Sequence, residues 1–467
     1  MWTIIVNILN NPPLPIRMRR KISKSFQYPT EETYIITHYK SLTNAFPSLP
    51  IQIERMVLFN QASFSKLKTC IILLCILLVD CQILESASQS LPLVPNILTF
   101  IDQRLALVFP IIQNFKKTIT SDPLGVTTTW VGPNICNYTG FYCDNPPDNL
   151  TATTIASIDF NGFQLSAPSL DGFIDRLPDL ALFHANTNSF SGTISPKIAG
   201  LKYLYELDLS NNLLSGVFPI SILNIPTLSF LDIRYNFFTG TVPPQIFMQA
   251  LDALFLNNNN FMLTLPNNLG NTLAAYLTLA NNKFTGPIPS SIGKASSTLR
   301  EVLLLNNHLT GCLPYEIGFL KNTILFDSGN NLLTGPLPYS FGCLEKVEQL
   351  NLARNMLYGE VPELVCALGN LVNLSLSFNY FTRVGPLCKK LIKNGVIDVR
   401  QNCIFGLPDQ RSVKECRAFF LIPRSCSHPA LFKVVPCKIP PLWKPHVKTQ
   451  SHRHLLSYSA LSRNRVL

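Results

Sequence analysis

His184 and Asp208 are two side chains of this 467-residue sequence that could exchange a proton, since they occupy matching positions in two neighbouring, similar segments. A hydrolytic site also needs a nucleophile, and none accompanies this pair. The sequence contains no G-x-S-x-G, no H-E-x-x-H and no phosphate-binding loop, because Gly293-Lys294 lacks the earlier glycine spacing. We therefore expect a solvated ion pair at His184 and Asp208, no enzyme activity, no cofactor and no metal site.

A second set of side chains suits binding better than catalysis. Carboxylates and aromatic rings recur at regular intervals along the chain, at Glu206, Asp208, Phe230, Asp232, Phe255, Tyr276 and Glu301. Carboxylates attract a basic ligand, and aromatic rings supply contact area. The alternative is a set of ordinary solvated residues, and the charge of Arg234 opposes the acids. The set predicts a binding surface for a basic peptide.

Ten of the 13 cysteines lie beyond residue 88, near the two ends of the segment that repeats. An even number of such cysteines is typical of disulfide-stapled caps in an exported protein. A zinc site is the other interpretation, but no C-x-x-C is present. Proximity along the chain favours five pairs: Cys136–Cys143, Cys312–Cys343, Cys366–Cys388, Cys403–Cys416 and Cys426–Cys437.

Three intact sequons could receive N-linked sugar in an exported chain. They begin at Asn137, Asn149 and Asn373. Chance occurrence is the alternative for any one of them, so we expect at least one to be glycosylated.

These residues are positioned by a repeat of about 24 residues, a period typical of leucine-rich repeats. Alignment on a Gly that precedes a Pro gives eleven copies, at Ala167, Gly192, Gly216, Gly240, Leu263, Gly286, Gly311, Gly335, Gly359, Arg383 and Gly406. In such repeats L-x-x-L-x-L forms a short parallel strand. The sequence predicts an α/β solenoid, a right-handed leucine-rich repeat horseshoe of about eleven repeats. Its parallel sheet should lie on the concave side, with short 3₁₀ turns opposite and a capping helix near residues 104–120.

An Asn four residues before the Gly recurs in ten copies, at Asn188, Asn212, Asn236, Asn259, Asn282, Asn307, Asn331, Asn355, Asn379 and Asn402. Its side chain can both donate and accept, so it can pair the buried amides of the turn. In the run Asn257–Asn260, we expect Asn259 to point inward, Asn257 and Asn258 to face outward, and Asn260 to belong to the turn.

The outward strand residues should form columns on the concave face. The central column is Asp159, His184, Asp208, Asp232, Phe255, Thr278, Leu303, Asp327, Asn351, Ser375 and Asp398. Neighbouring columns add Arg234, Tyr235, Arg354 and Arg400. The acids and aromatics between Glu206 and Glu301 form the predicted binding strip, with exposed carboxylates. Asn373 faces the same side, so a glycan there would block one end of the face.

The apolar run of residues 70–79, preceded by Lys66 and Lys68, is too short to span a membrane and fits a secretory signal. We predict a gene-model extension or disordered segment at 1–55, a signal peptide at 56–88 and an N-terminal cap at 89–154. Leucine-rich repeats follow at 155–406, a cysteine-containing C-terminal cap at 407–437 and a disordered basic tail at 438–467. Cys70, Cys75 and Cys81 lie in or beside the signal.

The net charge of +11 is unevenly distributed. Residues 89–416 carry 20 basic and 22 acidic residues, whereas residues 417–467 carry nine basic and no acidic ones. The basic excess therefore lies outside the repeats, which argues against nucleic-acid binding. Contact of the tail with acidic wall polysaccharide is one interpretation and a merely solvated tail the other. We expect no transmembrane anchor, and association into a dimer stays open.

Several stretches resemble the repeat domain of plant leucine-rich repeat extensins. They include "DLALFH", "LDALFLNNN" and "PDQRSVKEC", and the similarity covers residues 104–416. The resemblance implies an exported protein of the plant cell wall, or apoplast, that binds small basic signalling peptides of the rapid alkalinisation factor type. The sequence departs from the family because it has no Ser-Pro run and no Tyr-rich extensin module. It looks like a short, extensin-less relative.

Two other functions stay open at this point. One is a defence protein of the polygalacturonase-inhibiting type, which is also a secreted repeat solenoid. The other is a structural wall protein without a specific ligand. Binding of basic secreted peptides, compared with inhibition of a pectinase, would distinguish these functions.

Overall fold

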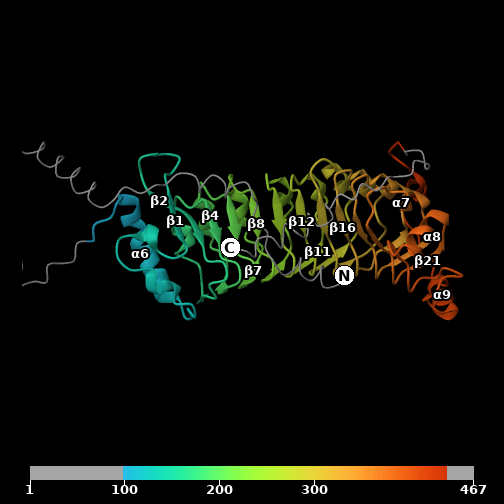
Figure 1. The fold of residues 1–467 in the computed structure, drawn as a ribbon, viewed down its shortest axis with the longest axis horizontal. Coiled ribbons are helices and arrows are strands. Elements are labelled where there is room, and N and C mark those ends of the chain that lie inside the picture. The colour runs from blue at the N-terminus through green and yellow to red at the C-terminus, as the bar shows by residue number, and fades with distance from the viewer. Residues whose placement is uncertain (1–97, 439–467) are drawn as a thin grey trace, which may run out of the picture. The chain divides into compact units, whose positions relative to one another are not determined.

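The computed structural model describes residues 98–438, and Figure 1 shows their strands stacked side by side along a solenoid. The predicted segments 1–55 and 56–88 and the tail beyond residue 438 lie outside the described residues. Within 98–438, twelve strands form one sheet in the order β1 (Phe141–Asp144), β2 (Thr154–Asp159), β4 (Leu182–His184), β6 (Glu206–Asp208), β8 (Phe230–Asp232), β10 (Ala253–Phe255), β12 (Tyr276–Thr278), β14 (Glu301–Leu303), β16 (Leu325–Asp327), β18 (Gln349–Asn351), β20 (Asn373–Ser375) and β22 (Ile397–Asp398).

Eleven of the strands in this described sheet are parallel and correspond to the eleven predicted repeats; β1 pairs antiparallel with β2. The middle residue of each three-residue strand points inward because side chains alternate along a strand. Leu207, Leu231 and Leu254 are in register on neighbouring strands and are almost fully buried. The leucine-rich repeat fold is therefore confirmed.

Further strands after each turn form lateral sheets beside the core. Within the described residues they are β3 (Ser166–Ala167), β5 (Ser189–Gly192), β7 (Leu213–Val217), β9 (Phe237–Gly240), β11 (Asn260–Thr264), β13 (Lys283–Gly286) and β15 (His308–Leu309), then β17 (Thr334–Pro336), β19 (Met356–Val361) and β21 (Tyr380–Val384). Phe238, Phe261 and Phe284 stack at centroid distances of 6.3 and 6.5 Å and form an aromatic spine along this side of the core.

The opposite side of each repeat is mostly 3₁₀ helix, as predicted. These turns are η4 (Ile174–Arg176), η5 (Pro196–Gly200), η6 (Ile220–Asn224), η7 (Pro244–Met248), η8 (Leu269–Asn271), η9 (Ser290–Ala295), η10 (Tyr315–Phe319) and η11 (Tyr339–Cys343). A proline, such as Pro219 or Pro314, caps several of them because it fixes the backbone and needs no ladder partner. The last two repeats differ, since α-helices α7 (Glu363–Cys366) and α8 (Pro386–Lys393) replace the 3₁₀ turn.

The predicted asparagine ladder is confirmed. Asn259 Oδ1 accepts from the Phe238 amide at 3.0 Å, and its Nδ2 donates to the Ile233 and Leu256 carbonyls at 2.9 and 3.2 Å. The other nine predicted asparagines make the same contacts, in each case accepting from an amide of the preceding repeat, as Asn212 does from Phe190. Each ladder residue therefore joins two repeats and satisfies turn groups that water cannot reach.

The neighbours of Asn259 differ from the prediction. Asn257 does not face outward into water: it is 1% exposed, its amide donates to Asn258 and its oxygen accepts from the Thr278 hydroxyl. Asn258 takes a left-handed backbone conformation, with φ 57°, and accepts from Asn281. Asn260 begins β11 instead of lying in the turn. The prediction failed because it considered one repeat alone, whereas the next repeat stacks against these amides.

The recurring Gly has positive φ wherever it is present, for example 84° at Gly192 and 77° at Gly240. Leu263 occupies the same position and keeps a φ of 69°, with its side chain 56% exposed. A Cβ in this region meets the following carbonyl oxygen, which costs about 1–2 kcal/mol. The backbone of Leu263 is therefore strained, and the neighbouring repeats hold it in this conformation.

The N-terminal cap begins with α6 (Gln103–Thr118), close to the helix predicted at 104–120 and with Pro110 inside it. Asp102 caps the helix by accepting from the Arg104 amide. Two 3₁₀ turns, η2 (Val126–Thr129) and η3 (Ile135–Asn137), follow, and buried Trp130 packs on Phe141 and Phe160. This cap covers the first strand pair of the solenoid.

The C-terminal cap overturns two of the predicted cysteine pairs. Cys136–Cys143, Cys366–Cys388 and Cys403–Cys416 form as predicted, but Cys312 bonds to Cys426 and Cys343 bonds to Cys437. After α9 (Val413–Phe420), the chain turns back along earlier repeats through η12 (Pro429–Lys433). Pairing cysteines by their proximity in sequence therefore failed for these four, because their partners in space lie far along the chain.

An aromatic cluster fixes the start of this returning segment. Phe419 of α9 stacks on Tyr380 at 3.5 Å, and the Arg424 guanidinium lies 3.8 Å from the Phe419 ring. The Tyr358 hydroxyl donates to the Arg424 carbonyl at 3.0 Å. The cap thus binds the last repeats through side chains as well as disulfides.

Replacement of Asn259 by Leu should lower the free energy of unfolding by roughly 1–3 kcal/mol, because the Phe238 amide and two carbonyls lose their partner. Asn267→Leu is the matched control, since Asn267 is exposed beyond the ladder. Urea unfolding of both variants measures the difference. Equal midpoints would contradict the role of the ladder.

Replacement of Leu263 by Gly should raise stability by up to about 1 kcal/mol, because Gly adopts positive φ without a Cβ clash. Thr264→Gly, one residue later, has no such strain to relieve and should destabilise the chain. The comparison of melting temperatures checks this prediction, and a lower value for Leu263→Gly than for the unchanged chain would refute it.

Candidate functional site

The concave face carries the predicted central column in register. Pairing of neighbouring strands joins, in order, Asp159, His184, Asp208, Asp232, Phe255, Thr278, Leu303, Asp327, Asn351, Ser375 and Asp398. These strands lie side by side through the middle of Figure 1. The period of the sequence therefore placed each residue of this column correctly.

The seven residues predicted for binding come together on five adjacent strands, β6 to β14. Glu206 and Phe230 are partners across β6 and β8, and Tyr276 and Glu301 are partners across β12 and β14. The rings of Phe230 and Phe255 meet edge to face at 5.6 Å. We call this group, Glu206, Asp208, Phe230, Asp232, Phe255, Tyr276 and Glu301, the acidic-aromatic strip.

The environment of its carboxylates differs from the prediction. Glu206, Asp208, Asp232 and Glu301 are each at most 9% exposed, whereas Tyr276 is 37% exposed. Side chains on strands about 4.8 Å apart cover one another, which a single strand cannot reveal. The carboxylates therefore cannot act as exposed steering charges and would have to meet a ligand as desolvated groups.

His184 pairs with Glu206 and not with Asp208, and the pair is buried instead of solvated. His184 Nε2 lies 2.9 Å from Glu206 Oε2, and both side chains are less than a tenth exposed. Burial lowers the pKa of His184, but the hydrogen bond to Glu206 and the charge of Asp208 outweigh it, so the net pKa is raised. The polar atoms of this pair therefore satisfy each other within the protein.

Asp208 and Asp232 lie side by side on β6 and β8. Arg234 Nε is 3.0 Å from Asp232 Oδ2, and its guanidinium lies 5.0 Å from the Phe255 ring. Burial raises the pKa of Asp232 well above its ordinary value; Arg234 opposes this shift and Asp208 adds to it. Within the described residues, Asp208 Oδ2 and Arg234 Nη2 are buried without a hydrogen-bond partner. Such groups are costly, so this part of the face suits a polar ligand.

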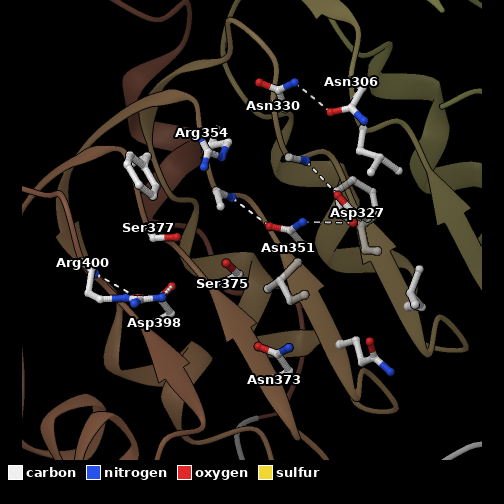
Figure 2. A pocket seen from close by; sticks show the side chains of 18 residues that line it. Asn306, Asp327, Asn330, Asn351, Arg354, Asn373, Ser375, Ser377, Asp398 and Arg400 are labelled. Atoms are coloured by element: carbon white, nitrogen blue, oxygen red, sulfur yellow. Dashed lines mark hydrogen bonds and ion pairs between the residues drawn. The ribbon is translucent and has the colours of Figure 1, made fainter. Parts of the chain in front are cut away.

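A hollow of about 230 Å³ lies farther along the concave face, over β16 to β22 (Figure 2). Its walls carry polar side chains, with the Phe378 ring at one side. The labelled side chains around it are Asn306, Asp327, Asn330, Asn351, Arg354, Asn373, Ser375, Ser377, Asp398 and Arg400. The sequence placed several of these in columns but did not select them, because a hollow depends on small residues such as Gly329, Ser375 and Ser377 standing together.

The polar groups of the hollow are held by local bonds. Asn351 Nδ2 donates to Asp327 Oδ2 at 3.0 Å, and the Gly329 amide donates to Asp327 Oδ1 at 2.9 Å. Arg400 binds Asp398 through two nitrogens, at 2.9 and 3.0 Å. Burial raises the pKa of Asp327 to about 6, and its two donors oppose the shift. The walls are therefore pre-arranged and offer both donors and acceptors.

Residues 98–438 contain neither a metal-binding cluster nor a membrane-spanning helix. No group of three or more metal-ligating side chains occurs there. No helix among those residues is both long and apolar enough to cross a membrane.

Comparison with known proteins gives consistent matches. The Leucine Rich Repeat family model matches residues 203–225 and 275–295. Leucine-rich repeat extensin-like protein 6 of Arabidopsis thaliana is 44% identical over 69% of this chain and 68% of its own length. Leucine-rich repeat extensin-like protein 2 of the same plant is also 44% identical, over 68% of this chain. The chain spans 41% of protein 2, and 35% and 25% of extensin-like proteins 4 and 3.

A solved structure shares the fold as well. The ectodomain of the Arabidopsis receptor kinase HAESA, in complex with a peptide hormone ligand, is 32% identical to this chain with a TM-score of 0.53. The match covers 60% of this chain and 46% of the HAESA chain. This chain is therefore similar in fold to a solenoid, the HAESA ectodomain, that binds a peptide.

The free energy of unfolding of the protein should depend on pH through Glu301 of the acidic-aromatic strip. Burial raises its pKa from 4.5 to about 7. The folded protein holds this proton more tightly than the unfolded chain. The contribution of Glu301 to the free energy of unfolding is therefore full below pH 4.5 and is lost as pH rises through 7. Glu301→Gln should remove on the order of 1–3 kcal/mol of the stability loss between pH 5 and pH 8.

Urea unfolding at the two pH values measures this difference. Glu345→Gln is the control, since Glu345 is exposed. An unchanged pH profile in Glu301→Gln would show that Glu301 is ionised in the folded protein at neutral pH.

Proposed function

Because this chain belongs to the leucine-rich repeat extensin-like family, we propose that it is an exported plant cell-wall protein that binds a small basic signalling peptide of the rapid alkalinisation factor type. The disulfides and the absence of a membrane-spanning helix in residues 98–438 agree with export. Binding of protein or peptide ligands is the role that the relatives and the HAESA fold support.

The acidic-aromatic strip is the proposed binding surface. The observation that carries this choice is the unpaired buried oxygen of Asp208 beside Asp232, next to the Phe230 and Phe255 rings. Both carboxylates are covered by their neighbours, so a guanidinium or ammonium group of a basic peptide would act on them through its charge, and its approach would favour the ionised form of Asp232. The rings would cover the apolar part of the same residue.

Tyr276 is the contact that a ligand reaches first. It is the most exposed member of the strip and lies between the buried acids of β6 and β8 on one side and Glu301 of β14 on the other. Interface energy usually concentrates in a few aromatic or arginine anchors. We therefore assign Tyr276 as an anchor that slows ligand release.

We assign roles to further parts of the chain from the sequence alone. Residues 56–88 would direct export, residues 89–154 and 407–437 would cap the repeats of 155–406, and the basic tail from 438 would contact acidic wall polysaccharide. A dimer is compatible with these assignments.

The binding test uses the secreted full chain on a surface plasmon resonance chip, with a synthetic basic, cysteine-containing peptide as the probe. Tyr276→Ala should speed dissociation about tenfold or more, which corresponds to about 1.4 kcal/mol. Tyr315→Ala is the matched control, since Tyr315 lies in η10 on the opposite side. Because buried charges are screened little, binding should weaken only modestly with added salt.

Other outcomes favour the other functions. Inhibition of a microbial polygalacturonase without peptide binding would support a defence protein. Failure of both assays, with a folded chain, would leave a structural wall protein. Equal effects of the two tyrosine variants on peptide release would show that the peptide binds outside the strip.

A further inference from the structure

The sequon at Asn373 opens onto the polar hollow. Asn373 and Ser375 are the two outward residues of β20, separated by buried Leu374, so the acceptor and the hydroxyl of the sequon point to the same concave face. Figure 2 shows Ser375 close to Asn351, whereas Asn373 lies farther along β20, at the edge of the labelled group and in register with Gln349. A sugar attached at Asn373 would thus start at the edge of the hollow.

The other two sequons have a different setting. Asn137 lies in η3 and Asn149 in the loop between β1 and β2, and both are exposed. Asn373 is half-buried in a strand, one position from the end of the sheet. Only β22, with two residues, follows it in the described sheet. A glycan at Asn373 could therefore leave the hollow over the C-terminal end, past Asp398 and Arg400.

The lining suits a sugar ring. Side-chain amides and hydroxyls of Asn351, Ser375 and Ser377 can donate to and accept from sugar hydroxyls and an acetamide group. The Phe378 ring offers an apolar face, and the Asp398–Arg400 ion pair stands at the exit with the Arg400 side chain 65% exposed. Charged side chains of Asp327, Arg354, Asp398 and Arg400 also line the hollow, and Asp327 and Asp398 are already hydrogen-bonded. The amides, hydroxyls and ring beside them suit the polar and apolar faces of a hexosamine.

We propose that Asn373 carries an N-linked glycan whose first N-acetylhexosamine lies in this hollow and closes the C-terminal half of the concave face to ligands. This inference rests on the proposed export, because the sugar donor is a lipid diphosphate oligosaccharide of the secretory pathway. In the transfer, Asn373 Nδ2 bonds to the anomeric carbon of the donor and loses a proton. The carbon–oxygen bond to the lipid diphosphate breaks, and the diphosphate leaves with the electron pair.

The consequence for recognition is a division of the concave face. The glycan covers β16 to β22, and the acidic-aromatic strip occupies β6 to β14. A peptide ligand is thereby confined to the strip. The hollow is a modification site whose role is to restrict binding, and it needs no soluble ligand.

The test uses full-length protein secreted from a mammalian cell line and treated with peptide N-glycosidase F before and after denaturation. Enclosure of the first sugar should make the Asn373 glycan resist release from the folded protein, whereas glycans at Asn137 and Asn149 are released. Denaturation should equalise the three sites. Glycopeptide mass spectrometry gives the occupancy of each.

Two variants separate glycosylation from folding. Ser375→Ala should abolish the sugar at Asn373, and Ser377→Ala, which alters the same hollow outside the sequon, should keep the sugar but speed its native release at least tenfold. An unmodified Asn373 in protein that carries sugar at Asn137 or Asn149 would overturn the inference while leaving export intact. Equal native release at all three sites would show that the sugar lies outside the hollow. Absence of sugar at every sequon would overturn the export on which the inference rests.

Discussion

The asparagine ladder is the interaction on which the rest of this solenoid depends. Each repeat must turn sharply after its short strand, and the turn leaves amides and carbonyls that water cannot reach. One Asn side chain provides an acceptor and two donors at that place, as Asn212 does for the Phe190 amide and the Leu209 carbonyl. Because the accepted amide belongs to the preceding repeat, each Asn stabilises its own turn and also ties that turn to its neighbour. The fold is therefore cooperative along its length.

That stacking also sets the electrostatics of the concave face. Parallel strands place Asp208 beside Asp232 and Glu206 beside His184, at a spacing that covers each side chain with the next. Burial then raises carboxyl pKa values, as at Glu301 and Asp327, and makes Arg234 and His184 necessary partners. The same regular face thus holds two different environments: an acidic strip with aromatic rings, and a hollow whose walls combine amides and hydroxyls with Asp327, Asp398 and Arg400.

The caps solve the problem that a solenoid has at its ends. The first strand gains an antiparallel partner, β1, and a helix that covers the exposed core. At the other end the chain reverses after α9, and two disulfides with sequence separations of 114 and 94 residues tie it to earlier repeats. Such long loops restrict the unfolded chain strongly in the loop-closure view. The stack of Phe419 on Tyr380 fixes the point of reversal.

The sequence by itself determined the fold, the register and the columns, because the position of a residue within a fixed repeat decides whether it points inward or outward. It identified Asn259 as a ladder residue and Asp208 as a concave one from their places in the aligned copies of the repeat. Only the tertiary structure decided what those columns become. The burial of Asp232, the pairing of His184 with Glu206, the second role of Asn257 and the Cys312–Cys426 bond all depend on contacts between segments distant in the chain. The hollow at Asn373 likewise exists because small side chains from several strands stand together, and volume is a property of their packing that no single repeat contains.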